Sequence, residues 1–126
     1  METVDGVAFR VRNAVLALVG VAGLVMKAGL GGPQAELVHN HGGNVAGSFA
    51  VYFVMANPCR MLRQRRLVTA AVALAVVNLF EATDGFGVMA NTYDPADYVA
   101  NGVGACLALV VDWVVSRVAA KRAERD

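Results

Sequence analysis

The chain contains four long apolar stretches, and the segments between and around them hold most of its charged residues. The stretches cover residues 13–30, 43–59, 67–82 and 98–115. Each is close to the roughly 20 residues that an α-helix needs to cross about 30 Å of hydrocarbon. None shows the alternation of apolar and polar residues that is typical of a strand. We therefore predict an all-α protein with four transmembrane helices.

The composition favours a bilayer over water as the surroundings of these stretches. Hydrophobic residues make up 57% and charged residues 17% of the 126 residues, and the mean hydropathy is +0.52. Soluble domains usually carry about 25% charged residues. Because the length suits one domain, we expect residues 1–126 to form a single four-helix bundle of two transmembrane hairpins. The net charge of +1 gives no reason to expect a nucleic acid partner.

The basic residues predict the orientation of the helices. If the four helices alternate in direction, every Lys and Arg except Lys27 falls on one side of the membrane. These residues are Arg10, Arg12, Arg60, Arg63, Arg65, Arg66, Arg117, Lys121, Arg122 and Arg125. Because cytoplasmic loops are enriched in Lys and Arg, we predict a multi-pass protein of the cell membrane with both termini in the cytoplasm.

The residues before the first apolar stretch leave two interpretations open. Val4, Val7, Ala8 and Val11 recur at helical spacing, which favours a short interfacial helix. A frayed terminus is the alternative. The first stretch also lies where a cleaved signal peptide would lie, although we expect it to be retained.

Two charged residues are predicted to lie deep in the membrane on the side away from the basic residues. Lys27 and Glu81 each lie 14 residues into their predicted helices, which is about 21 Å from the cytoplasmic side. A charged side chain within a transmembrane segment costs about 2.5–3.5 kcal/mol, and it usually faces a partner or a cavity. We expect Lys27 and Glu81 to interact, directly or through Asp84. Separate snorkelling of Lys27 to the interface is the alternative.

Polar and small residues follow one face of the second helix and one face of the fourth. On the second helix they are His41, Asn44, Ser48 and Tyr52. On the fourth they are Asp97, Asn101, Gly104, Ala108 and Asp112. Such faces usually turn toward the interior of a bundle, where they line a polar pocket or only hold the helices together. Both roles remain open, and the candidate pocket residues are Lys27, Asn44, Glu81, Asp84, Asp97 and Asn101.

Other kinds of chemistry receive little support from the sequence. It contains no phosphate-binding loop, dinucleotide fingerprint or nucleophile elbow, and nothing orients Ser48 and His41 as a catalytic pair. We expect no cofactor and no metal, since the possible ligands lack a second matched pair. Those ligands are His39, His41, Glu81, Asp84 and Asp97. Cys59 and Cys106 lie in or beside apolar stretches, and we expect both to stay reduced.

Residues 78–108 resemble the VanZ-like family of small membrane proteins. They read NLFEATDGFGVMANTYDPADYVANGVGACLA. Glu81 and Asp84 match a Glu and a polar residue three positions later in one family helix. The Asp-x-x-x-Asn-x-x-Gly run that opens the next family helix is matched by Asp97, Asn101 and Gly104. The segment NVAGSFAVYF after Gly43 is more loosely similar to an earlier family helix.

The resemblance covers the second half of the chain well and departs from the family at two points. The family usually has Gln where Asp84 stands, and an Arg in the loop before Asp97 that residues 83–96 lack. Lys27 is a candidate for supplying that positive charge. The family is associated with the cell envelope and, in one branch, with low-level glycopeptide resistance.

Three functions are compatible with these features. The first is a VanZ-like envelope protein whose outer-leaflet polar pocket binds a lipid headgroup or an envelope precursor. The second is a structural accessory subunit of a larger membrane complex. The third is a transporter or channel protomer in a homo-oligomer, with Asp112 and Glu81 along the path. The sequence does not decide whether the protein is an enzyme, and it predicts no partner beyond membrane lipids and such a complex or oligomer.

Overall fold

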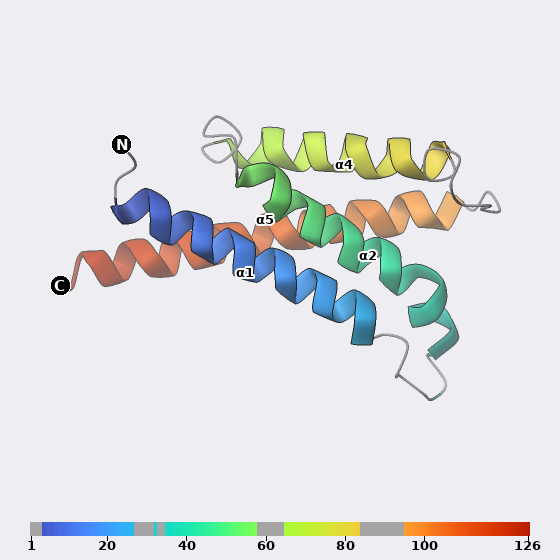
Figure 1. The fold of residues 1–126 in the computed structure, drawn as a ribbon, viewed down its shortest axis with the longest axis horizontal. Helices are drawn as coiled ribbons and strands as arrows, with labels where there is room; N and C mark the ends of the chain where they lie inside the picture. The colour runs from blue at the N-terminus through green and yellow to red at the C-terminus, as the bar shows by residue number, and fades with distance from the viewer. Residues whose placement is uncertain (1–3, 27–31, 33–34, 58–64, 84–94) are drawn as a thin grey trace.

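The structure, a computed structural model, describes residues 4–26, 32, 35–57, 65–83 and 95–126, with only the backbone for 4, 5 and 35–40. These parts of the chain form four helices and no strand (Figure 1). The helices are α1 (Val4–Met26), α2 (Ala35–Ala56), α4 (Arg66–Ala82) and α5 (Pro95–Ala123). The prediction of an all-α fold with four helices is therefore confirmed.

Two helices extend beyond the apolar stretches that predicted them. α1 begins at Val4 rather than near residue 13, so residues 4–12 are continuous with the first helix and form neither a separate interfacial helix nor a frayed end. α5 runs from Pro95 to Ala123 instead of 98–115. Proline suits the first position of a helix because its missing N–H has no partner there. At the other end, basic side chains in the last turn of α5 complement the helix dipole.

α2 begins earlier than expected, at Ala35. The apolar stretch that predicted this helix begins only at residue 43, whereas the Gly42-Gly43 pair lies inside the helix. A glycine in a helix interior destabilises it by about 1 kcal/mol relative to alanine. Contacts on both sides of the pair offset this effect, since His41 and Asn44 both contact α5.

The third predicted helix is close to the structure. α4 covers Arg66–Ala82, against an expected 67–82. The Thr83 hydroxyl donates to the Leu79 carbonyl oxygen at 2.7 Å and so satisfies one of the last carbonyls of the helix.

α2 lies at the centre of the bundle and packs against α1, α4 and α5, while α4 also packs against α5. α1 begins and α5 ends at one end of the molecule, which we call the terminal end (Figure 1). α2 and α5 both begin at the opposite end, the far end, so these two helices run in the same direction. The polar faces of α2 and α5 are therefore aligned from end to end.

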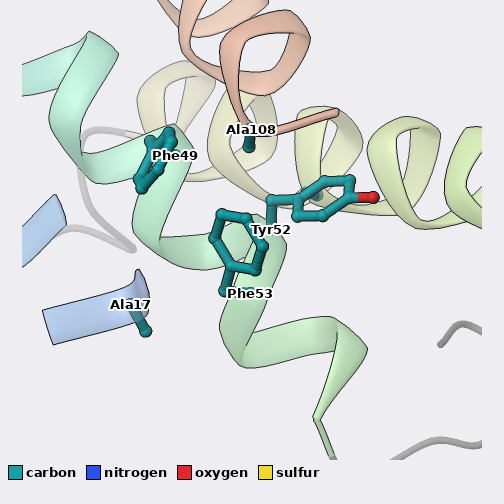
Figure 2. Packing of buried hydrophobic residues seen from close by; sticks show 6 residues of the cluster. Ala17, Phe49, Tyr52, Phe53 and Ala108 are labelled. Carbon is teal, nitrogen blue, oxygen red and sulfur yellow. The ribbon is translucent and has the colours of Figure 1, made fainter. Parts of the chain in front are cut away.

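The core combines aromatic side chains of α2 with small residues of its neighbours. Tyr52 and Phe53 are fully buried, and their ring centroids lie 4.9 Å apart. Ala17 of α1 and Ala108 of α5 belong to the same buried cluster. Figure 2 shows the Phe53 ring turned toward Ala17, whereas the Tyr52 hydroxyl points away from both. This direction matters because the hydroxyl has a polar partner on α5, described below.

Two glycines allow the helices to approach α2 closely. A Cβ on Gly20 of α1 would lie 2.9 Å from the Ala50 Cβ and 3.0 Å from Phe49 Cδ1. A Cβ on Gly104 of α5 would collide with the Ser48 hydroxyl and the Val45 carbonyl oxygen. Small residues at such crossings are typical of helices that pack in a membrane.

The large aliphatic side chains face outward rather than inward. Val25 of α1 is 70% exposed, and Val99 of α5 is 68% exposed. By length and composition, Gly6–Met26 and Pro95–Ala123 are apolar enough to cross a membrane. Contiguous apolar surface of this kind is rare on soluble monomers and marks contact with lipid or with another protein.

Candidate functional site

The far end of the bundle carries a hydrogen-bonded group that we call the Asp97 cluster (His41, Asn44 and Asp97). Asn44 Nδ2 donates to Asp97 Oδ1 at 2.7 Å, and His41 Nδ1 lies 3.2 Å from the same oxygen. Asp97 is in the first turn of α5, where the helix dipole stabilises negative charge. The side chains of His41 and Asp97 are 24% and 15% exposed, so the cluster lies where the bundle interior meets the surface.

The cluster offers two hydrogen-bond acceptors to a ligand. In the part of the chain that the structure describes, both contacts fall on Asp97 Oδ1, and Oδ2 receives no hydrogen bond. When the neutral His41 ring donates from Nδ1, its Nε2 becomes an acceptor. Asn44 holds the carboxylate in place from the next turn of α2. An acceptor oxygen of this kind, with the ring nitrogen of His41 as a second acceptor in that tautomer, fits a ligand that carries hydroxyl or ammonium donors.

One turn further into the bundle, a second polar contact joins α5 to α4. Asn101 Nδ2 donates to Asn78 Oδ1 at 3.1 Å, and Asn101 is 2% exposed. Glu81, three residues after Asn78, is half-buried near the end of α4. Asn101 therefore links two helices directly beneath the Asp97 cluster, rather than contacting the cluster itself.

The structure brings together part of the predicted pocket. Asn44 and Asp97 are in direct contact, and Asn101 is bonded one turn away. Lys27 and Asp84 lie outside the described residues, so the interaction of Lys27 with Glu81 stays a prediction.

The structure gives no catalytic, metal-binding or disulfide role to the other candidate residues that it describes. In the described part of the chain, the Ser48 hydroxyl contacts backbone carbonyl oxygens of its own helix, those of Asn44 at 2.7 Å and Val45 at 3.2 Å, rather than His41. No group of three or more His, Cys, Asp or Glu that could hold a metal occurs among the described residues. The side chains of His39 and Asp84 are not among them. Cys106 is a free thiol on the exposed face of α5, and Cys59 lies outside the described part.

A second polar group, buried at the terminal end, receives a side chain from each helix. Arg12 Nη2 of α1 donates to Asp112 Oδ1 at 2.8 Å. The Tyr52 hydroxyl of α2 donates to Asp112 Oδ2 at 2.6 Å, and Arg66 Nε of α4 lies 3.4 Å from that oxygen. The Asp112 side chain is only 4% exposed. We call this group, with Ser116 of α5, the Asp112 network.

Arg12 makes most of the contacts that complete the Asp112 network. Its Nη1 donates to the Ser116 hydroxyl at 2.9 Å, and Ser116 donates onward to Asp112 Oδ1 at 3.3 Å. Arg12 Nε and Nη2 donate to Asn13 Oδ1 at 3.1 and 2.7 Å. A buried carboxylate is tolerated only when its charge and lone pairs are matched in this way. The network is therefore a structural joint between the helices.

The sequence indicates the residues of this network but not that they contact one another. Tyr52 and Asp112 end the two polar faces, and Arg12 and Arg66 served only as signs of orientation. The direction of the helices is the signal that could have linked these residues, because the second and fourth predicted helices both run toward the basic side. The ends of their polar faces therefore meet where Arg12 and Arg66 are predicted to lie.

The chain was compared with known proteins at the level of families, sequences and folds. No family model, curated protein or solved structure matches it. The resemblance of residues 78–108 to the VanZ-like family therefore stays a prediction. Of the residues that carry this resemblance, Asp97 and Asn101 make the far-end contacts described above, and Gly104 makes the close approach to α2.

Proposed function

We propose that the chain is a VanZ-like integral membrane protein whose Asp97 cluster binds the polar headgroup of an envelope lipid or lipid-linked precursor. In this proposal all four helices cross the membrane, and both termini are cytoplasmic. The Asp97 cluster then lies at the outer leaflet. The observation that carries the proposal is the partly buried Asp97 carboxylate, which His41 and Asn44 contact through Oδ1 and which leaves Oδ2 without a hydrogen bond in the described part of the chain.

The distribution of apolar surface supports membrane insertion. Valine and leucine side chains cover the outside of α1 and α5, while alanines fill much of the inside. The shortest helix, α4, has 17 residues and spans about 26 Å at 1.5 Å per residue. This is within the mismatch that a bilayer accommodates by thinning or by snorkelling of flanking residues.

The distribution of charge supports the orientation. The terminal end carries Arg12 and Arg66, and the last turns of α5 add Arg117, Lys121 and Arg122. The far end carries Asp97 and His41 instead. Enrichment of basic residues on the cytoplasmic side assigns the terminal end to the cytoplasm and the Asp97 cluster to the outer surface.

Native mass spectrometry of the protein extracted with its lipids tests the proposal. We expect the wild type to retain a lipid whose headgroup carries hydroxyl or amine donors. Asp97→Asn should reduce that retention roughly tenfold or more, because a hydrogen bond to a charged group contributes about 1.5–3 kcal/mol. Glu124→Gln, which changes an exposed carboxylate at the terminal end, is the matched control. Equal retention by Asp97→Asn and the wild type, with both folded, would refute the assignment.

The same spectra bear on the two alternative functions. A second protein retained in fixed stoichiometry would favour an accessory subunit, and a symmetric oligomer would favour a transporter or channel. The conduction hypothesis gains no support from Asp112, because Arg12, Tyr52 and Arg66 enclose its carboxylate within one chain.

A further inference from the structure

An open groove of about 680 Å³ runs between α1 and α2 from the terminal end. This volume lies in the range of small-molecule sites, about 300–1,000 Å³. Its polar end is formed by Arg10, Asn13 and Asn57. The rest of its wall is apolar, with Ala14 and Leu18 among its residues. The groove is therefore amphipathic along its length.

Asn13 presents an unsatisfied donor in this groove. Its side chain is fully buried, and Nδ2 has no hydrogen-bond partner among the described residues. Two N–H groups of Arg12 donate to Oδ1 of Asn13. They fix the orientation of the amide, because a flip would set donors against donors. A buried amide N–H normally has an acceptor, and a ligand in the groove that Asn13 lines would supply one.

Two further groups define the chemistry of that ligand. Arg10, exposed at the mouth of the groove, provides positive charge. Asn57 Oδ1 is a buried acceptor without a partner in the described part of the chain. A phosphate oxygen would satisfy Asn13 and interact with Arg10, while a hydroxyl next to the phosphate would satisfy Asn57. Together, Arg10, Asn13 and Asn57 favour an anionic ligand that also carries a hydrogen-bond donor.

The depth of the apolar wall identifies the rest of the ligand. Leu18 and Val21 of the groove follow Asn13 by five and eight residues, or about 8 and 12 Å along the helix. Phe53 and Val54 form the opposite wall on α2. The polar groups thus lie at the end of the helices and the apolar wall lies deeper, as in a lipid that stands in a leaflet.

We infer that this groove binds one anionic phospholipid of the cytoplasmic leaflet, with a hydroxylated headgroup of the phosphatidylglycerol type. The phosphate lies between Arg10 and Asn13, and one acyl chain lies along Leu18 and Val21. The inference rests on the membrane orientation proposed above, but it uses the opposite end of the bundle from the Asp97 cluster. Each site is therefore tested by its own variants.

Lipid titration in detergent, followed by native mass spectrometry, tests the inference with phosphatidylglycerol and phosphatidylcholine as probes. The wild type should retain one phosphatidylglycerol at least tenfold more strongly than phosphatidylcholine. Asn13→Asp keeps the acceptor for Arg12 and removes the donor, and should abolish this preference. Ala14→Phe should block the groove while leaving Asn13 unchanged. Val15→Phe adds the same ring at an exposed position of α1 outside the groove and should retain the lipid.

The outcomes separate a lipid site from its alternatives. Equal retention of the two lipids by the wild type, or retention unchanged in Ala14→Phe, overturns the inference. Displacement of the lipid by millimolar glycerol 1-phosphate also overturns it, because the apolar wall would then contribute nothing. If Asn13→Asp fails to fold, Ala14→Phe still decides. Asp97→Asn should lose the far-end lipid but keep one phosphatidylglycerol in the groove, and Ala14→Phe should do the reverse, so failure of the far-end proposal is distinguishable from failure of this one.

Discussion

Replacing Asp112 with asparagine should destabilise the bundle more than any other single change of one side-chain atom in the described helices. The carboxylate accepts hydrogen bonds from Arg12, Tyr52 and Ser116. Asparagine keeps one oxygen that can still accept from Arg12 and Ser116, but its amide nitrogen cannot accept from the Tyr52 hydroxyl, a loss of about 0.6 kcal/mol. The larger effect is the loss of the negative charge, because a buried ion pair broken on one side costs about 3–5 kcal/mol. We therefore expect Asp112→Asn to lower the free energy of unfolding by about 3–5 kcal/mol.

Unfolding in mixed micelles with increasing SDS measures this loss. The single tryptophan, Trp113, follows Asp112 directly and reports on this part of α5 by fluorescence, while circular dichroism reports on all helices. Glu124→Gln makes the same chemical change at an exposed position and should alter stability by less than about 0.5 kcal/mol. Tyr52→Phe removes one donor to Asp112 and completes a double-mutant cycle.

The same double-mutant cycle includes a result that would refute a buried Asp112 network. If Asp112 and Tyr52 act through their hydrogen bond, the double variant should differ from the sum of the single variants by more than about 0.5 kcal/mol. A loss below about 1 kcal/mol for Asp112→Asn, together with additive single effects, would contradict a buried network. Asp112 would then be hydrated in the folded protein, and the helices would be held together by packing alone.

Two further predictions concern packing and topology. Gly104→Ala should destabilise the bundle by about 1–3 kcal/mol in the same SDS assay, because its methyl group would collide with α2. Gly102→Ala, where an added Cβ meets nothing within 4 Å, should be neutral or stabilising by up to about 1 kcal/mol; equal losses would contradict the close approach. In intact cells, an impermeant maleimide should label Asp94→Cys and not Gln64→Cys. Labelling of Gln64→Cys alone would show that the orientation is the reverse of the proposed one. Native Cys106, on the apolar face of α5, should not react in either orientation.

The helices themselves were largely predictable because the signals for them are local. Apolar stretches of membrane length gave all four, and α4 differs from its expected bounds by one residue. The polar faces of α2 and α5 also followed from helical spacing, and Asn44 does contact Asp97. Such features depend on neighbours three or four positions away, which the sequence displays directly.

The features that were missed depend on partners far away in the chain. The second apolar stretch begins two residues after His41, whose contact is Asp97, 56 residues later. Arg12 was interpreted as a residue at the membrane surface, yet its acceptor on Asp112 is 100 residues away. The sequence does not show which distant residue a charged side chain will contact. For the same reason, it does not show that Asn13 and Asn57 line one groove, as they do in the fold.

The order of synthesis gives the Asp112 network a consequence for biogenesis. A ribosome makes Arg12, Tyr52 and Arg66 before it makes the carboxylate that joins them. In the membrane orientation proposed above, the first three helices enter the bilayer before α5 is made, and their three donors then lack their common acceptor. Insertion of the last helix supplies it. A chain truncated before Asp112 should therefore resemble an unassembled protein, and we expect membrane quality-control proteases to degrade it.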